Sequence, residues 1–315
     1  MVGLVAFAGA AVTAGGLPAQ AAAGAASGGS GASGGTAGNW YGSGGAVRLG
    51  VPAYWSAGDP AGAAAFDRLV AAAATVDRVI VNGPASGPAD PFDPVLAAAI
   101  RRLAAAGITV LGYVDTGYLG RTGAATTRVE AGSTDLAHWL AQADADAATW
   151  QRLYGSAGLR GIFFDQTVPD CGEGDGFLRA YGQLADGVWG RGRGAVVAIN
   201  PGVAVEECYT EVADVIVVAE NTFTAYRDWT PPAWVYQHPR SAFWHLVHGA
   251  QTPELMREAV TLAQRRNAGS VYVTDAVIDG TGGPWNALPA APYWSAEVDA
   301  ARATRLRCGR RAYRA

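Results

Sequence analysis

Lysine is missing from this chain, and all 23 basic residues are arginines. The absence excludes enzymes that form a Schiff base through lysine and P-loop nucleotide-binding proteins, because both depend on the lysine amine. Charged residues make up only 16% of the chain, and the formal net charge is −4. This balance gives no electrostatic signature of nucleic-acid binding, so we expect no nucleic-acid partner.

Cysteine is scarce, with Cys171, Cys208 and Cys308 and no C-x-x-C spacing, so a zinc or redox motif is not predicted. His245 and His248 form H-x-x-H, but on a strand residues three apart point to opposite faces. The sequence also lacks G-x-S-x-G, G-x-G-x-x-G and phosphate-loop motifs. We therefore expect neither a metal nor a cofactor.

The N-terminus carries an apolar run from Val2 to Leu17 that is too short and too rich in glycine to predict a membrane span. Pro-Ala-Gln-Ala-Ala-Ala follows, which is typical of a signal-peptide cleavage site near residues 21–23. We predict a signal peptide over 1–23, with a true start upstream because no basic n-region precedes the run. A disordered Ala/Gly leader is the alternative. Residues 24–46 are rich in Gly, Ser and Ala and predict a flexible linker. The protein is thus expected to be secreted or associated with the cell wall.

After the linker, short apolar runs alternate with segments whose apolar positions are spaced as in helices, which predicts alternating strands and helices. Eight apolar, β-branched or aromatic runs are the predicted strands: 47–55, 78–83, 109–116, 161–166, 195–200, 215–220, 242–247 and 270–275. Segments with spaced apolar positions are the predicted helices: 61–74, 94–106, 134–154, 176–190, 252–267 and two shorter ones around 207–213 and 224–235.

This alternation predicts the α/β class and a single-domain (β/α)8 TIM-like barrel over 47–295. An open eight-stranded sheet is the alternative. Residues 296–315 are predicted to be an Arg-rich C-terminal tail, either frayed and solvated or a patch that holds an anionic wall polymer. We expect a monomer. Cys171 and Cys208 each follow a predicted strand, so they would share one barrel face. In an exported protein they could form a disulfide, and two buried free thiols are the alternative.

In such a barrel, the residues at the carboxyl ends of the strands form the site. Aromatic rings there can stack on sugars while amides and carboxylates bind hydroxyls, so carbohydrate is the expected ligand. The predicted substrate-binding residues are Tyr54, Asn82, Tyr113, Asp115, Tyr118, Gln166, Asn200 and Asp275. For the tyrosines the alternative is barrel packing, and for Asp115 it is a structural hydrogen bond.

Asp165 and Glu220 end two strongly apolar strands, Gly-Ile-Phe-Phe-Asp and Val-Ile-Val-Val-Ala-Glu. Two carboxylates that face one cleft are the minimum for cleaving a glycosidic bond, so we predict that both are catalytic. Asp165 could instead cap a helix, but the next predicted helix begins ten residues downstream. Glu220 could instead belong to an ion pair.

A set of motifs in order resembles the spherulin-4 (spherulation-specific) family from about residue 48 to 294. These motifs are Val51-Pro-Ala-Tyr-Trp55, Ile80-Val-Asn-Gly-Pro84, Gly112-Tyr-Val-Asp-Thr-Gly-Tyr118, Gly161-Ile-Phe-Phe-Asp165, Asn200-Pro-Gly202, Glu207-Cys-Tyr209, Ala213-Asp-Val215, Tyr272-Val-Thr-Asp275 and Pro284-Trp-Asn286. The resemblance implies a (β/α)8 barrel similar to glycoside hydrolases that act on α-1,4-linked galactosamine or N-acetylgalactosamine polymers.

The resemblance also implies a carboxylate triad in which the fourth strand ends Asp-Glu and the sixth carries Glu. Asp165 and Glu220 match the first and third positions, whereas Gln166 occupies the second. An amide neither donates nor accepts a proton as a carboxyl group does. Two readings follow: a secreted glycoside hydrolase of amino-sugar polysaccharide, or a catalytically inactive barrel that acts as a glycan-binding, cell-wall or spore-coat protein.

Overall fold

The computed structural model describes residues 45–121, 133–203, 205–278 and 283–312, and side chains as far as Arg305. The predicted signal peptide and nearly all of the predicted linker lie outside these residues. The side chain of Cys308 lies outside them as well.

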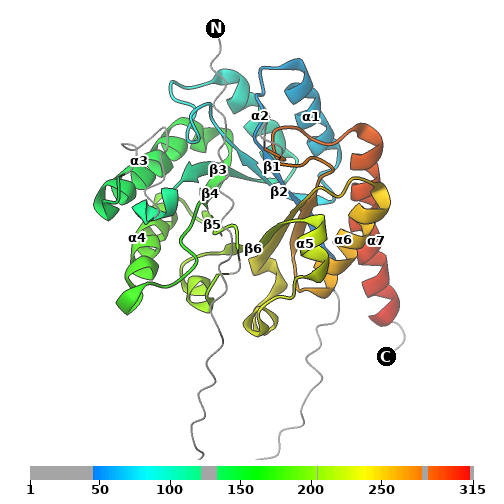
Figure 1. Cartoon of the computed structure of the whole chain (residues 1–315). Coiled ribbons are helices and arrows are strands. Elements are labelled where there is room, and N and C mark those ends of the chain that lie inside the picture. The colour runs from blue at the N-terminus through cyan, green and yellow to red at the C-terminus, as the bar shows by residue number, and fades with distance from the viewer. Residues whose placement is uncertain (1–44, 122–132, 204, 279–282, 313–315) are drawn as a thin grey trace, which may run out of the picture.

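Eight parallel strands of the described chain close into a barrel in sequence order, which confirms the predicted fold. Figure 1 shows the strands at the centre of the molecule with the helices around them. The strands are β1 (Arg48–Ala53), β2 (Val76–Val81), β3 (Thr109–Asp115), β4 (Leu159–Asp165), β5 (Val196–Asn200), β6 (Val215–Thr222), β7 (Phe243–His248) and β8 (Ser270–Val273).

Helical segments connect consecutive strands and cover the outside of the barrel, as predicted. The α-helices are α1 (Pro60–Ala71), α2 (Pro94–Ala105), α3 (Leu136–Tyr154), α4 (Gly176–Arg191), α5 (Phe223–Asp228), α6 (Pro253–Arg265) and α7 (Ala291–Ala312). Short 3-10 helices are η1 (Gly117–Gly120), η2 (Gly155–Ala157), η3 (Glu173–Asp175), η4 (Glu207–Glu211), η5 (Ala233–Gln237) and η6 (Arg240–Ala242). Local sequence explains the helix starts: Asp93 caps α2 through bonds from the N–H groups of Val95 and Leu96, and Pro94 follows it.

The prediction that a tail begins at residue 296 is wrong for the described side chains. Helix α7 continues through this stretch and packs against α6 and β1. Trp294, Val298 and Ala301, spaced by four and three residues, are buried against the barrel, whereas Arg302 stays exposed. Arg302 and Arg305 make this helical apolar stripe hard to recognise in the sequence, because they occupy its solvent face.

Aromatic rings fill the barrel interior from the amino ends of the strands to the carboxyl ends. The Arg78 guanidinium lies 5.7 Å from the Trp244 ring, and Trp244 contacts Phe163 with centroids 5.8 Å apart. Phe163 in turn lies 6.2 Å from Tyr113, whose hydroxyl reaches Asp165. Gly50 makes room for Trp244, because a Cβ there would lie 2.7 Å from the indole. This aromatic column supports the floor of the carboxyl end.

The barrel is closed, but the pairing between β8 and β1 is short. Their pairing is confined to Arg48 with Ser270 and Leu49 with Val271, whereas β1 pairs with β2 as far as Ala53. Beyond this point Trp285 lies beside the end of β1, because the Tyr54 N–H donates to the Trp285 carbonyl over 3.2 Å. We call this short β1–β8 pairing, together with Trp285, the seam.

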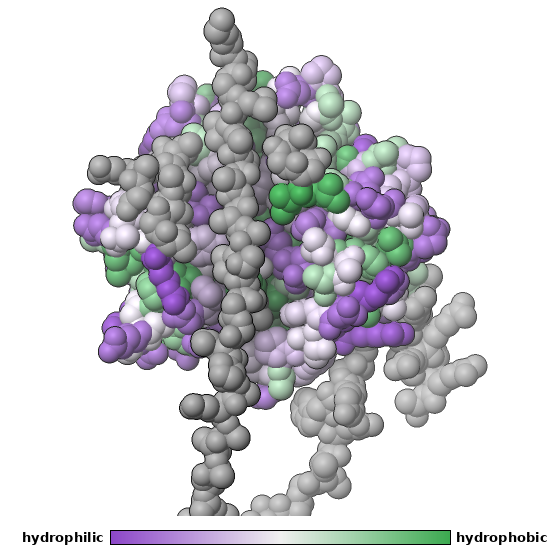
Figure 2. Space-filling model, in the orientation of Figure 1, coloured by the Kyte–Doolittle hydropathy of each residue, from purple (hydrophilic) through white to green (hydrophobic). Residues whose placement is uncertain are grey.

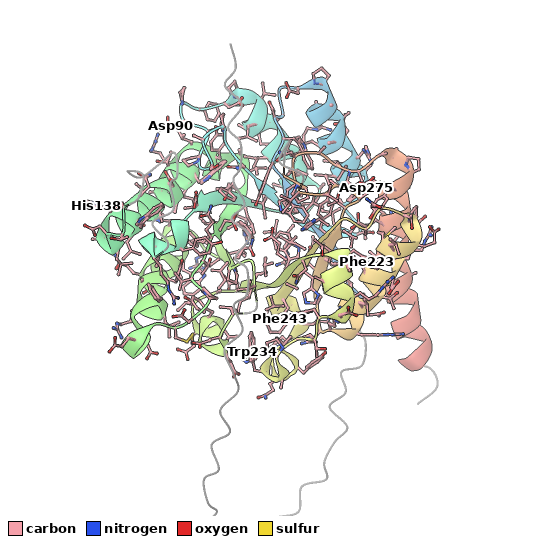
Figure 3. All side chains as sticks on the ribbon, viewed as in Figure 1. Asp90, His138, Phe223, Trp234, Phe243 and Asp275 are labelled. Carbon is pink, nitrogen blue, oxygen red and sulfur yellow. A yellow bond between two sulfur atoms is a disulfide. The ribbon has the colours of Figure 1, made fainter. Side chains whose placement is uncertain are left out.

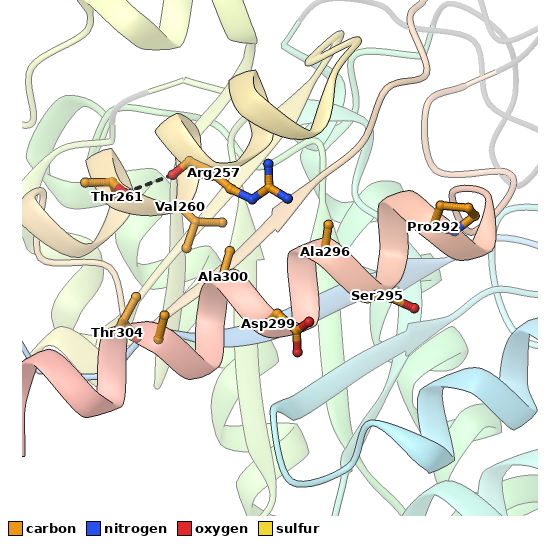
Figure 4. A pocket seen from close by; sticks show the side chains of 10 residues that line it. Arg257, Val260, Thr261, Pro292, Ser295, Ala296, Asp299, Ala300 and Thr304 are labelled. Atoms are coloured by element: carbon orange, nitrogen blue, oxygen red, sulfur yellow. Dashed lines mark hydrogen bonds between the residues drawn. The ribbon is translucent and has the colours of Figure 1, made fainter.

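A cavity of about 470 Å³ lies outside the barrel between α6 and α7, with Arg257 and Asp299 among its lining residues (Figure 4). It is separate from the carboxyl ends of the strands. On the face in Figure 2, hydrophobic residues form small separate patches among hydrophilic ones. No helix among the described residues is long and apolar enough to cross a membrane.

Candidate active site

Asp165 ends β4 as a half-buried carboxylate with two side-chain donors. The Tyr113 hydroxyl donates to its Oδ2 over 2.7 Å, and Asn200 Nδ2 donates to its Oδ1 over 2.8 Å. Burial raises the pKa of Asp165, while these two bonds and a backbone bond oppose the rise because they favour the charged form. The carboxylate is therefore held in a fixed orientation.

Glu220 lies near the end of β6 and is half-buried as well. Asn200 Nδ2 donates to its Oε2 over 2.6 Å, and Trp285 Nε1 donates to its Oε1 over 3.2 Å. Burial, and then the negative charge of Asp165, raise the pKa of Glu220 to about 7. Glu220 is thus suited to carry a proton near neutral pH.

Asn200 joins the two acids because β5 lies between β4 and β6. Its Oδ1 accepts the Gly202 N–H over 3.0 Å, which turns the amide nitrogen toward the carboxylates. Because Nδ2 lies 2.8 Å from Asp165 Oδ1 and 2.6 Å from Glu220 Oε2, those oxygens are at most about 5.4 Å apart. This upper bound is compatible with the about 5–5.5 Å between the carboxyl groups of retaining glycosidases and is shorter than the about 6.5–9.5 Å of inverting ones.

Tyrosines surround the acid pair. Tyr54 and Tyr113 meet edge to face with centroids 5.2 Å apart, and Tyr118 follows β3 in a left-handed conformation with φ of 51°. Burial and the charges of Asp165 and Glu220 raise the pKa of Tyr54 and Tyr118. These hydroxyls therefore stay protonated and can donate hydrogen bonds.

Asp115 lies beside Asp165 in the strand register but is only 4% exposed. Its Oδ1 accepts the Gly117 N–H over 2.8 Å, so it anchors the turn that follows β3. Burial raises the pKa of Asp115 to about 7; the Gly117 bond opposes this, and the charges of Asp165 and Asp146 add to it. The geometry favours the structural alternative for this residue.

Gln166 adopts a left-handed backbone with φ of 52°, an uncommon conformation for a side chain of this kind. Its carbonyl accepts the Tyr118 N–H over 2.8 Å and the Thr116 hydroxyl over 2.9 Å. The residue therefore connects the turns that follow β3 and β4. Its half-buried side chain lies next to Asp165 in the chain.

Asn82 and Asp275 lie at strand ends without joining this hydrogen-bond network. Asn82 is half-buried, and its buried Oδ1 has no hydrogen-bond partner among the described residues. Asp275 is exposed (Figure 3), with a long 3.5 Å bond from Thr274. Strand β8 ends at Val273, two residues before the predicted end, and this places Asp275 in the loop outside the barrel.

The predicted disulfide is confirmed: Cys171 and Cys208 are bonded, with their Cα atoms 6.4 Å apart. It ties the loop after β4 to η4, which follows β5. Among the described residues, one group of side chains has ligand atoms close enough for a metal, namely these two cysteines with Glu206. The disulfide occupies both sulfur atoms of that group.

His245 and His248 point to opposite faces of β7, as predicted. His245 accepts or donates a 2.7 Å bond with Tyr226 of α5, on the outside of the barrel. His248 meets Trp285 edge to face, with centroids 6.0 Å apart.

Trp285 is the contact of the acid pair that sequence reasoning missed. It follows no predicted strand, so a list of strand ends does not include it. The available signal was the Pro284-Trp-Asn286 motif, which carried the family resemblance without a role.

The closed barrel with two acids at its carboxyl end defines a (β/α)8 barrel with a candidate active site. Residues 48–301 match the model of spherulation-specific family 4, and the chain belongs to this family. It is 27% identical to Spherulin-4 of Physarum polycephalum over 239 residues, which make up 73% of this chain and 63% of that protein. The chain thus spans less than two thirds of this relative.

Solved structures show the same fold. Aspergillus clavatus Sph3, solved in complex with GalNAc, has a TM-score of 0.64 and 23% identity, covering 82% of this chain and 98% of its own. A chitinase from Chromobacterium violaceum has a TM-score of 0.52 and 15% identity, covering 80% of this chain and 99% of its own. At these identities the likeness concerns architecture.

Proposed function

We propose that the protein is a secreted glycoside hydrolase that cleaves α-1,4-linked galactosamine- or N-acetylgalactosamine-containing polysaccharide. The observation that carries the proposal is the Asn200 bridge, which brings the carboxylates of Asp165 and Glu220 together within a range compatible with a retaining acid pair. The disulfide supports export, because such bonds persist in oxidising compartments.

In the mechanism, Asp165 is the nucleophile and Glu220 is the general acid. Tyr113 and Asn200 stabilise the charged form of Asp165, whereas burial and the neighbouring charge keep a proton on Glu220. An Asp165 oxygen attacks the anomeric carbon while Glu220 protonates the departing glycosidic oxygen. Glu220, now ionised, then takes a proton from water, which hydrolyses the covalent glycosyl-enzyme.

The chemistry at the strand ends supports an amino-sugar substrate. The named residues are carboxylates, amides and tyrosines, with no arginine among them, so cationic sugar units are favoured. The GalNAc bound to the structurally similar Sph3 agrees with a hexosamine ligand. The tyrosine hydroxyls and Asn82, whose Oδ1 lacks a partner, are the proposed sugar contacts.

Gln166 favours the second candidate, an inactive glycan-binding or cell-wall or spore-coat barrel. The hydrolase is preferred because the mechanism requires two carboxylates and both are in place. In addition, the hydrogen bonds that involve Gln166 are made by its backbone, so they do not depend on a carboxyl group.

The test measures reducing ends released from α-1,4-polygalactosamine and its acetylated form. We expect release by the wild type, loss of about a thousandfold or more in Glu220→Gln and Asp165→Asn, and unchanged release by Glu211→Gln, which alters an exposed acid. NMR of the first product should show retained anomeric configuration. Binding without turnover, unaffected by Glu220→Gln, would favour the inactive barrel instead.

A further inference from the structure

At the seam, one side chain that does not belong to a strand end contacts the acid pair. Trp285 lies in the loop between β8 and α7, yet its indole N–H reaches Glu220 across the barrel end. This is possible because β1 and β8 separate beyond Leu49 and Val271, which leaves room for the loop between them.

The position of Trp285 is fixed from several directions. Its carbonyl accepts the N–H of Tyr54, which directly follows β1, and its ring packs on Tyr272 of β8 with centroids 5.8 Å apart. His248 of β7 meets the ring edge to face, and only 7% of the residue is exposed. A ring enclosed in this way loses little further freedom when it donates a hydrogen bond.

Glu297 of α7 is a second support of the seam, because its side chain takes the place of a missing strand partner. Its Oε1 accepts the Val273 N–H over 2.8 Å, and Glu297 is fully buried. Strand β8 would otherwise leave this N–H unpaired, because β1 has separated from it. The seam is therefore a stable feature of the fold.

We propose that Trp285 is a positioning residue that fixes the Glu220 carboxyl group by donating its indole N–H to Oε1. The inference rests on the proposed function for its catalytic meaning. With Asn200 on Oε2 and Trp285 on Oε1, each oxygen has one fixed donor, so the carboxyl plane cannot rotate. A fixed plane directs the proton toward the glycosidic oxygen.

The bond also affects the titration of Glu220. A donor to a carboxylate favours the charged form, so Trp285 lowers the pKa of Glu220 against the larger effects of burial and Asp165. The other titratable groups around the acid pair are three tyrosines, one histidine and one further carboxyl group: Tyr54, Tyr113, Tyr118, His248 and Asp115. Burial raises the pKa of the tyrosines and lowers that of His248, so these four groups stay neutral near pH 7. Burial raises the pKa of Asp115 to about 7, so its titration is followed separately from that of Glu220.

The test is a ¹³C NMR titration of the Glu220 carboxyl carbon in the intact protein. We expect Trp285→Phe, which keeps an aromatic ring but loses the donor, to raise the apparent pKa of Glu220 by about one pH unit. Tyr272→Phe is the matched control, because it removes a hydroxyl beside Trp285 but keeps the ring that packs on the indole. An unchanged pKa in Trp285→Phe would overturn the proposal, whether or not the protein hydrolyses any glycan.

A second readout needs no Trp285 variant. In the wild type, the indole N–H resonance of Trp285 should shift with pH along the Glu220 titration, and Glu220→Gln should abolish that shift. An indole resonance that ignores the Glu220 titration would overturn the proposal as well. In turnover assays, Trp285→Phe should move the alkaline limb of the pH profile upward by about one unit, and a purely structural role would lower turnover without moving it.

Discussion

Replacing Glu220 by glutamine should change how stability depends on pH. The structure raises the pKa of Glu220 from its ordinary 4.5 to about 7, so the folded protein binds this proton more tightly than the unfolded chain does. For a raised pKa, the stabilisation is complete below the unfolded pKa and is lost as the pH rises through the folded one. The wild type should therefore lose stability between about pH 4.5 and 7.

The magnitude follows from the shift. About 2.5 pKa units at 1.36 kcal/mol each give roughly 3 kcal/mol of unfolding free energy lost across this window. Glu220→Gln removes this dependence, and Asp165 adds to the difference because it loses a negative neighbour. Any constant cost of the amide cancels, since the comparison concerns slopes and not absolute stabilities.

The assay is equilibrium urea unfolding at constant ionic strength at pH 4.5, 6 and 7.5, with the disulfide intact. The wild-type curve should fall relative to Glu220→Gln, whereas Glu211→Gln should follow the wild type. If the free energy of unfolding changed with pH in parallel for the wild type and Glu220→Gln, the reasoning would be refuted. Glu220 would then have the same pKa in the folded and unfolded states.

Three further perturbations test the surroundings of the site. Asn200→Ala removes a hydrogen-bond donor to both acids. We expect its pH–rate profile to show an apparent pKa raised by about one unit or more and turnover lowered at least about tenfold. An unchanged profile would contradict the role of Asn200 as a bridge. Replacing Cys171 and Cys208 together by serine opens a loop of 37 residues and should lower the free energy of unfolding in urea by roughly 3–4 kcal/mol. As a control, a reducing dithiol should not destabilise that double variant any further. Gly50→Ala places a methyl group 2.7 Å from Trp244 and should lower the free energy of unfolding by about 1–3 kcal/mol through overpacking. A melting temperature equal to that of the wild type would show that the aromatic column can shift to accommodate the methyl group.

The strand pattern was predictable because each buried strand of a parallel barrel is a short, nearly continuous apolar run. The same logic located Asp165, Asn200 and Glu220, since they follow directly on such runs. Their hydrogen bonds were not predictable, because periodicity specifies a face but not a rotamer. The bridge by Asn200 depends on its Oδ1 being held by Gly202.

Other features depend on tertiary context that no local pattern carries. Trp285 reaches Glu220 because two distant strands separate, an event without a local sequence signal. Asp275 is exposed because β8 ends early. The assignment of residues 1–23 as a signal peptide, export and the monomeric state stay predictions.

The seam also determines when, during synthesis, the Glu220 carboxyl group can be fixed in place. Trp285 is 65 residues further along the chain than Glu220, so both acids are synthesised well before the indole that donates to Glu220. A nascent chain with seven strands has an open barrel and an unfixed proton donor. Glu220 is therefore fixed only after synthesis has passed residue 285, and a chain cut short before that residue would keep both acids without the donor that fixes Glu220.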